Sequence, residues 1–255
     1  MFMRLVQLKV KSGRVESYQQ FYRGRIIPTL EKVRGCRYAA LIQSMQHPDE
    51  CLSLTLWNGE EDALAYERAG VFDKLLAGTR PYLLESTESK LQLSEDLTLE
   101  YVPILTEPVV TGLPVAEGNG SPVSLEGRRS SMCVRILSLK LRPGKRAEFD
   151  TFYRNRVIPA LRGVSGCLQI YLAERTDRAD EVLSVTTWEK KEDAEAYEAS
   201  GLFARLLESQ RDTLSELYDW KMEEQKKTAG VLTTSEDPTV ERFAIIVGRV
   251  FRQSS

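Results

Sequence analysis

Two short rows of hydroxyl and aromatic residues recur along the chain at alternate positions: Ser53, Thr55 and Trp57, and then Ser184, Thr186 and Trp188. On a β-strand, alternate side chains share one face, so each row is expected on a single face of a sheet. Buried hydroxyls need hydrogen-bond partners, which makes such a row unusual for a plain apolar core. The rows suit a cavity that holds a flat, polar aromatic molecule. A strand tryptophan is most often a core residue, so ordinary packing stays the alternative.

Tyrosine, arginine and phenylalanine side chains on the expected helices complete the candidate set. They are Tyr22, Tyr66, Tyr153 and Tyr197, Arg25 and Arg156, and Phe72 and Phe203. A phenol can bind or deprotonate an acidic substrate, and a guanidinium can orient an anionic one. The alternatives are tyrosines whose hydroxyls reach solvent at a helix edge and arginines whose stems pack while their heads are hydrated.

These candidates come in pairs because the chain contains an internal duplication with an offset of 131 residues. The pairing needs no gap, and roughly 30 of about 75 positions are identical. Phe21-Tyr22-Arg23 matches Phe152-Tyr153-Arg154, and Trp57 matches Trp188. The period is much longer than that of a solenoid unit, so each copy should form a domain.

Each copy shows hydrophobic periodicity that predicts the element order β-α-β-β-α-β, the split ferredoxin-like pattern. In the first copy the expected elements are strands at residues 4–11, 36–43, 51–57 and 88–93 and helices starting at residue 15 and over 60–77. Pro28 and Pro159 should kink or interrupt the first helix of their copies, because proline has no backbone donor. The predicted fold class is therefore α+β, with two ferredoxin-like domains.

Composition excludes several classes of function. With 35 basic and 37 acidic side chains in 255 residues, the chain has no broad basic field for nucleic acid or an anionic membrane. The single histidine, His47, cannot build a multi-histidine metal site, and no GxGxxG or GxxxxGK[ST] motif is present. The four cysteines are too few for a disulfide scaffold and favour a cytoplasmic location. We therefore expect no metal and no cofactor.

The run Phe-Tyr-x-x-x-x-Ile, a glycine, a strand ending in tryptophan and a helix ending in Gly-x-Phe resembles the antibiotic biosynthesis monooxygenase domain. The resemblance covers residues 3–93 and 133–223. It implies ferredoxin-like sheets that pair into an α+β barrel, and an active-site role for Trp57 and Trp188. The family includes cofactor-free monooxygenases of anthrones and quinols and haem-degrading monooxygenases, and its fold hosts many functions.

The resemblance is incomplete at the polar positions of both branches. The haem ligand of the family aligns with Leu76 and Leu207, and the first-strand asparagine of that branch aligns with Val6 and Leu137. An asparagine and a tyrosine of the quinol-oxidising branch are replaced by serine and alanine in both copies. The first hypothesis is therefore a cofactor-independent monooxygenase that takes a small aromatic polyketide or quinol and dioxygen. The alternatives are a non-catalytic binding or structural module and, last, a haem-binding protein.

The same analysis predicts how the copies are assembled. We expect a first domain over 1–110, a linker over 111–131 rich in Gly, Pro and Ser, and a second domain over 132–255. One face of each sheet is apolar and needs a cover, so the copies should pack as an internal pseudo-dimer, with further homodimerisation open. The alternation from Thr239 to Phe251 predicts a last strand, with a counterpart in Leu97 to Val110, and each should join the sheet of the opposite copy.

Overall fold

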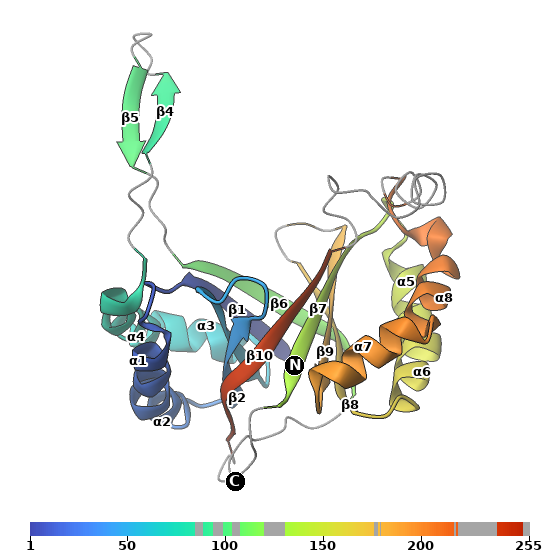
Figure 1. The fold of residues 1–255 in the computed structure, drawn as a ribbon, viewed down its shortest axis with the longest axis horizontal. Helices are drawn as coiled ribbons and strands as arrows, with labels where there is room; N and C mark the ends of the chain where they lie inside the picture. Colours follow the sequence, from blue (N-terminus) through green and yellow to red (C-terminus); the bar gives the residue numbers. More distant parts are fainter. Residues whose placement is uncertain are drawn as a thin grey trace.

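The computed structural model describes residues 1–84, 89–93, 99–103, 108–119, 131–175, 178, 180–216, 218 and 239–251. Within these residues, eight antiparallel strands close into one barrel, in the order β1-β3-β2-β10-β7-β9-β8-β6 (Figure 1). Their bounds are β1 Phe2–Lys9, β2 Cys36–Ser44, β3 Glu50–Trp57, β6 Val109–Asn119, β7 Cys133–Lys140, β8 Cys167–Glu174, β9 Glu181–Trp188 and β10 Thr239–Val250. Both copies therefore contribute to a single sheet.

Strand alternation separates the interior of the barrel from its outer face. Leu52, Leu54 and Leu56 of β3 point inward and pack with Leu183 and Val185 of β9 in one apolar core. The intervening side chains of the same strands point outward, toward the helices. The predicted packing of the two apolar sheet faces is confirmed, and so is the α+β class with an internal barrel.

Two strands, β6 and β10, each pair with both copies. β6 pairs with β1 of the first copy and β8 of the second, while β10 pairs with β7 of the second copy and β2 of the first. β10 confirms the strand expected from the alternation at the end of the chain. Because neither strand leaves an edge open, the barrel closes without a strand from another chain.

The first copy departs from the predicted element positions. Residues 109–119, most of which were expected as linker, form β6, so the counterpart of β10 lies later than Leu97 to Val110. The expected fourth strand is β4, Ser89–Leu93, which pairs only with β5, Leu99–Pro103, in a hairpin outside the barrel (Figure 1). Glycine and proline are depleted in strands, so Gly112 and Pro114 outweighed the extended pattern of residues 109–115 in the sequence. In the structure, Pro114 is the last residue that pairs with β1, and the pairing with β8 begins at Val115.

The helix that follows the first strand of each copy is continuous but contains a π-helical turn. In the first copy it comprises α1 Val15–Phe21, a π turn over Tyr22–Ile26 and α2 Ile27–Leu30. The second copy has α5 Arg146–Phe152, a π turn over Tyr153–Val157 and α6 Ile158–Arg162. Pro28 and Pro159 are the second residues of α2 and α6, separated from these turns by one residue. Proline lacks the donor that would continue the α-helical pattern, and the wider turn accommodates it without a break.

The second helix of each copy is divided in two by a glycine. The first copy has α3 Glu60–Arg68 and α4 Val71–Thr79, where one helix over 60–77 was expected. The second copy has α7 Lys191–Ala199 and α8 Leu202–Glu208. Gly70 and Gly201 adopt left-handed backbone angles, with φ of 66° and 73°, which other residues rarely adopt. The bend turns Phe72 and Phe203 back over the barrel. Short 3-10 turns, Arg80–Tyr82 and Arg211–Thr213, follow.

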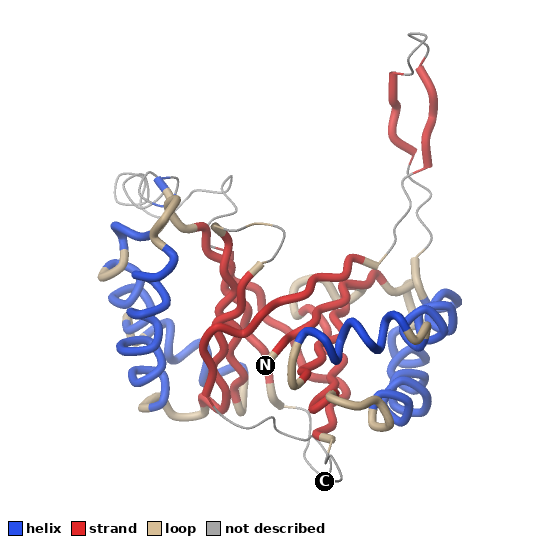
Figure 2. Tube along the Cα trace, turned by 180° about the vertical axis from the view of Figure 1, so that it is seen from behind, coloured by secondary structure: helices blue, strands red, loops and turns tan. Residues whose placement is uncertain are grey.

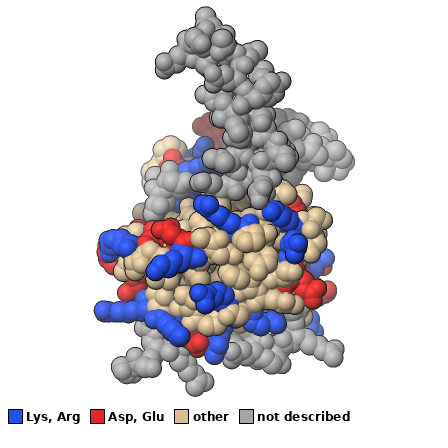
Figure 3. All heavy atoms as spheres, turned by 90° about the vertical axis from the view of Figure 1, so that its left-hand side faces the viewer, with Lys and Arg blue, Asp and Glu red and all other residues tan. Residues whose placement is uncertain are grey.

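The helices of the two copies cover opposite sides of the barrel, as both ribbon views show (Figures 1 and 2). Each helical layer encloses its own apolar core against the outer face of the strands, in addition to the core inside the barrel. Lys and Arg side chains are spread across the helical face of the first copy (Figure 3). None of the described helices is long and apolar enough to cross a membrane. The molecule is thus an internal pseudo-dimer with two helix-covered sites.

The shared strand β10 generates a first prediction. Replacing its buried Phe243 with alanine empties part of the barrel interior, so we expect a loss of about 3–5 kcal/mol of unfolding free energy. For a chain of this size that corresponds to a melting temperature lower by at least about 6 °C. The control is Glu241→Gln on the same strand, because the pKa of Glu241 is raised by burial and by nearby Glu50, and its charge does not stabilise the fold. Equal melting temperatures for wild type and Phe243→Ala would contradict a barrel core shared by both copies.

Candidate functional site

Each copy has a cavity between the outer face of its strands and its helices that is partly open to solvent; its empty volume, with the adjoining solvent included, is about 450 Å³ in the first copy and 470 Å³ in the second. The first cavity is lined by residues that include Arg4, Ser53, Thr55, Tyr66, Phe72 and Leu76. The second cavity is lined by their counterparts Arg135, Ser184, Thr186, Tyr197, Phe203 and Leu207. Both are mostly apolar, with a few converging polar groups, which is typical of small-molecule sites.

A buried arginine on the first strand of each copy is the main charged group of each cavity. Arg4 shares the outward face of β1 with Val6 and Leu8, and its side chain is only 4% exposed. Its Nη2 lies 2.6 Å from Oε1 of Glu67, and its Cζ lies 4.0 Å from the centre of the Phe72 ring. Burial lowers the pKa of Arg4, while Glu67 opposes that shift. The guanidinium remains a cation because its ordinary pKa is above 12.

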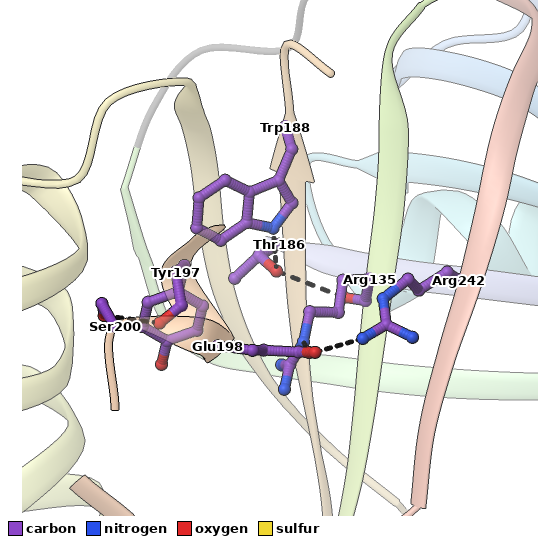
Figure 4. Close-up of polar contacts among 7 residues, drawn as sticks. All are labelled: Arg135, Thr186, Trp188, Tyr197, Glu198, Ser200 and Arg242. Carbon is purple, nitrogen blue, oxygen red and sulfur yellow. Dashed lines mark hydrogen bonds and ion pairs between the residues drawn. The ribbon is translucent and has the colours of Figure 1, made fainter. Parts of the chain in front are cut away.

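The second cavity repeats this arrangement and adds a second arginine (Figure 4). Nε of Arg135 donates to Oε1 of Glu198 at 2.7 Å, and its Cζ lies 4.4 Å from the Phe203 ring centre. Oε2 of the same carboxylate accepts a hydrogen bond from Nη2 of Arg242, which β10 contributes. Glu198 therefore holds two guanidiniums.

The two tryptophans stand behind the cavities and do not line them. Trp57 and Trp188 are fully buried, and the indole Nε1 of each donates at 2.9 Å to the hydroxyl of the threonine two residues earlier, Thr55 or Thr186. Their rings lie 5.2 and 5.4 Å from those of Tyr66 and Tyr197. The indoles thus fix the tyrosines and threonines that face each cavity, as Figure 4 shows for Trp188.

A buried pair of hydroxyls joins the first helix of each copy to its third strand. The Tyr22 and Ser53 hydroxyls lie 2.8 Å apart, and those of Tyr153 and Ser184 lie 2.7 Å apart. Both tyrosines stand in the π-helical turns, which direct them onto the sheet. Tyr153 and both serines line the cavities, and Tyr22 lies just behind.

Burial decides which chemistry the tyrosines can perform. It raises the pKa of Tyr197 to about 12 and the pKa values of Tyr22, Tyr66 and Tyr153 well above their ordinary value. At neutral pH these phenols are protonated, so they can donate hydrogen bonds but are poor general bases.

The structure brings most of the residues predicted for the site together around the two cavities. One predicted pair of arginines lies elsewhere, and one pair of cavity arginines was not predicted. Arg25 and Arg156 are exposed on the first helices, and neither lines a cavity. The arginines that do are Arg4 and Arg135, which were not among the candidates from the sequence. The available signal was a charge on the apolar face of a strand, repeated 131 residues later together with Glu67 and Glu198.

Among the described residues, the lining of the two cavities includes no histidine, cysteine, aspartate or glutamate. The positions that align with the family's haem ligand, Leu76 and Leu207, line the cavities with apolar side chains. His47 lies in the turn between β2 and β3 and does not line either cavity. In the part of the chain that the structure describes, no group of three His, Cys, Asp or Glu residues is arranged to hold a metal ion.

A model of the antibiotic biosynthesis monooxygenase family matches both copies, at residues 1–77 and 132–209. The chain belongs to the antibiotic biosynthesis monooxygenase family. The two matched segments contain all the described lining residues of the two cavities except Thr79 and Gln210. The strands β6 and β10 lie outside them, so barrel closure uses segments beyond the family domain.

Solved structures share the tandem architecture of this family member. A candidate monooxygenase from Fusobacterium nucleatum is 8% identical and has a TM-score of 0.69, covering 98% of this chain and 94% of that one. A candidate monooxygenase from Lactobacillus acidophilus is 7% identical with a TM-score of 0.64, covering 98% and 99%. An anthrone oxidase-like protein is 12% identical with a TM-score of 0.53, covering 98% and 92%. At these identities the likeness shows the fold alone. Comparison with curated proteins gives no match.

The raised phenol pKa values predict that the family member loses stability at alkaline pH. The folded state holds the Tyr197 proton more tightly than the unfolded state, so this contribution is complete below pH 10 and is lost as the pH rises toward about 12. Buried thiols such as Cys133, whose pKa is raised to about 11, also lose stabilisation as the pH rises. Their contribution begins to fall at a lower pH than that of Tyr197, because the ordinary pKa of a thiol is lower than that of a phenol. Melting temperatures measured across this range should fall with pH, and the fall should be shallower in Tyr197→Phe. The same slope in both proteins would contradict a neutral, buried phenol.

Proposed function

We propose that the protein is a cofactor-independent monooxygenase of a small, acidic aromatic substrate of the anthrone or quinol type. The observation that carries the proposal is the buried guanidinium that stacks on a phenylalanine inside each apolar cavity. Arg135 lies over Phe203, and Arg4 over Phe72. Such a group can stabilise negative charge on a flat ring held in the same cavity.

The reaction requires a substrate that supplies its own electrons. In an anthrone, the methylene group loses a proton, and the resulting carbanion reduces dioxygen. One oxygen atom becomes the new carbonyl oxygen, the other leaves as water together with both methylene hydrogens, and the carbon is oxidised. A hydroquinone instead loses a hydroxyl proton and reacts with dioxygen at a ring carbon that carries hydrogen, which gives a hydroxyquinone and water. An enzyme accelerates this reaction by binding the anion more tightly than the neutral substrate, which is the role we assign to the arginines.

The remaining residues orient the substrate and keep water away. Tyr66 and Tyr197 donate hydrogen bonds to its oxygen, with Ser53 and Ser184 on the opposite wall. Trp57 and Trp188 act as positioning residues, because each packs against the tyrosine without lining the cavity. Since the tyrosines are poor bases, the substrate must be acidic enough to ionise beside a guanidinium. This requirement favours phenols, anthrones and hydroquinones over simple hydrocarbons.

Oxygen consumption tests the proposal. Full-length protein incubated with anthrone or a hydroquinone should consume dioxygen at the same rate with and without a metal chelator, and labelled dioxygen should place one label in the product. The double variant Tyr66→Phe/Tyr197→Phe removes one tyrosine hydroxyl from each cavity. It should lower kcat/KM about tenfold or more, because each of these donors acts on developing negative charge. Tyr82→Phe is the matched control, since this hydroxyl lies outside the cavity lining.

A non-catalytic binding module of the same fold is the second candidate, and the same preparation distinguishes it. That candidate keeps aromatic ligands in the cavities but consumes no dioxygen with any anthrone or hydroquinone. Ligand binding without turnover would therefore overturn the monooxygenase proposal and leave the binding role.

Haem titration examines the remaining alternative. With leucine at both positions of the family's axial ligand, we expect no stoichiometric haem complex and no shift of the Soret band to that of a ligated haem. A one-to-one complex that Leu76→Ala abolishes would refute this expectation.

A further inference from the structure

The two cavities share their architecture but differ in charge, and the difference originates in the strands that close the barrel. Each closing strand places one residue directly opposite the cavity arginine. β10 places Arg242 opposite Arg135, whereas β6 places Gly112 opposite Arg4. The positions are structurally equivalent, although the internal sequence repeat does not include them.

The first copy has no room for a matching arginine. A Cβ atom on Gly112 would lie 2.7 Å from Cζ of Phe2, which is far inside van der Waals contact. Phe2 therefore occupies the space above Gly112. The absence of a second cation there is part of the packing of the first copy.

In the second copy one carboxylate pairs with two arginines, so a net positive charge remains beside the cavity. Glu198 is shared by Arg135 and Arg242, whereas Glu67 pairs with Arg4. Nε of Arg4 in the first copy is buried without a hydrogen-bond partner, and so are Nη2 of Arg135 and Nε of Arg242 in the second, so the second copy has two such donors beside its carboxylate. The Arg135 side chain is only 3% exposed and lines the cavity. A buried donor left without an acceptor is costly, and an anionic ligand oxygen would satisfy it.

A further acidic residue, Asp73, increases the difference in charge between the two cavities. Burial lowers the pKa of Arg4 and raises that of Tyr66, and the negative charge of Asp73 opposes the first shift and adds to the second. The equivalent position in the second copy is Ala204. The Arg4 guanidinium thus pairs with one carboxylate, Glu67, and is also influenced by the charge of exposed Asp73, while in the second copy two guanidiniums share one carboxylate. The formal charges of these sets are opposite in sign.

We propose that the two cavities are specialised, and that the second cavity is the one that binds an anionic aromatic ligand. The ligand's carboxylate or phenolate oxygen accepts hydrogen bonds from Arg135, which the Glu198–Arg242 pair holds in place. The first cavity binds the uncharged form of such a ring. This inference rests on the proposed function in taking the cavities as ligand sites, and it assigns the reaction through a substrate anion to the second copy.

Binding of a charged probe and its neutral isostere tests the assignment without turnover. The full-length protein is titrated calorimetrically with 2-naphthoate and with 2-naphthamide. We expect one naphthoate site per chain, weakened about tenfold by Arg242→Gln because a nearby charge is lost. Arg249→Gln is the matched control on the same strand, since Arg249 pairs with Glu31 on the first helix instead. Naphthamide binding should change little in either variant.

A second variant keeps the test independent of changes near Glu198. Asp73 is exposed on α4, so Asp73→Ala should fold normally while copying Ala204 into the first copy. It should create a second, weaker naphthoate site or raise the affinity of the first cavity severalfold. Two equal naphthoate sites in the wild type would overturn the specialisation. So would equal losses in Arg242→Gln and Arg249→Gln.

Failure of this inference can be distinguished from failure of the proposed function. If naphthoate selects the second cavity but no anthrone or hydroquinone is oxidised, the monooxygenase proposal fails and the charge selectivity stands. If oxidation occurs and Arg4→Gln and Arg135→Gln reduce it equally, the function stands and the specialisation is wrong.

Discussion

Pairing of β6 and β10 with strands of both copies is the constraint on which the rest of the structure depends. A ferredoxin-like sheet has two edges and one apolar face, and each copy alone would leave them in water. Because each closing strand joins one edge of each copy, the two faces meet as a single barrel core. The helical layers are then forced to opposite sides, and each encloses its own cavity.

The buried arginines are the second constraint, since a charge in an apolar core is expensive unless it is compensated. A carboxylate and the face of an aromatic ring compensate each guanidinium. This explains why the glycine bend before α4 and α8 matters, because it brings Phe72 and Phe203 over Arg4 and Arg135. Arg4 and Arg135, which line the cavities, each keep one buried donor without a hydrogen-bond partner. What stabilises the charge in the free protein also leaves it ready for an anion.

Duplication within one chain permits the two sites to differ, whereas two identical subunits would have to change together. The family domains of both copies keep the same tyrosine, serine, threonine and tryptophan framework. The divergence lies in the closing strands, where Arg242 and Gly112 occupy equivalent places, and on the second helix, at Asp73 and Ala204. A single chain thus retains one architecture while giving its two cavities opposite charge.

The sequence by itself determined the duplication, the α+β class and the outward row of Ser53, Thr55 and Trp57, because these depend on local periodicity and on identity between copies. Only the tertiary structure decided that residues 109–119 close the barrel. The glycines and the proline of this segment are typical of a linker, and it forms a strand because β1 and β8 pair with it. The tertiary structure also placed Trp57 and Trp188 behind the cavities, because the alternation of a strand does not tell which residues of a face reach the ligand space. Arg25 and Arg156 are exposed, because a helical period does not tell which polar residue of a helix points toward the sheet. The pairing of Arg242 with Glu198 joins residues from a closing strand and a helix. Such a contact depends on the register between β10 and β7, which no local pattern in the sequence encodes.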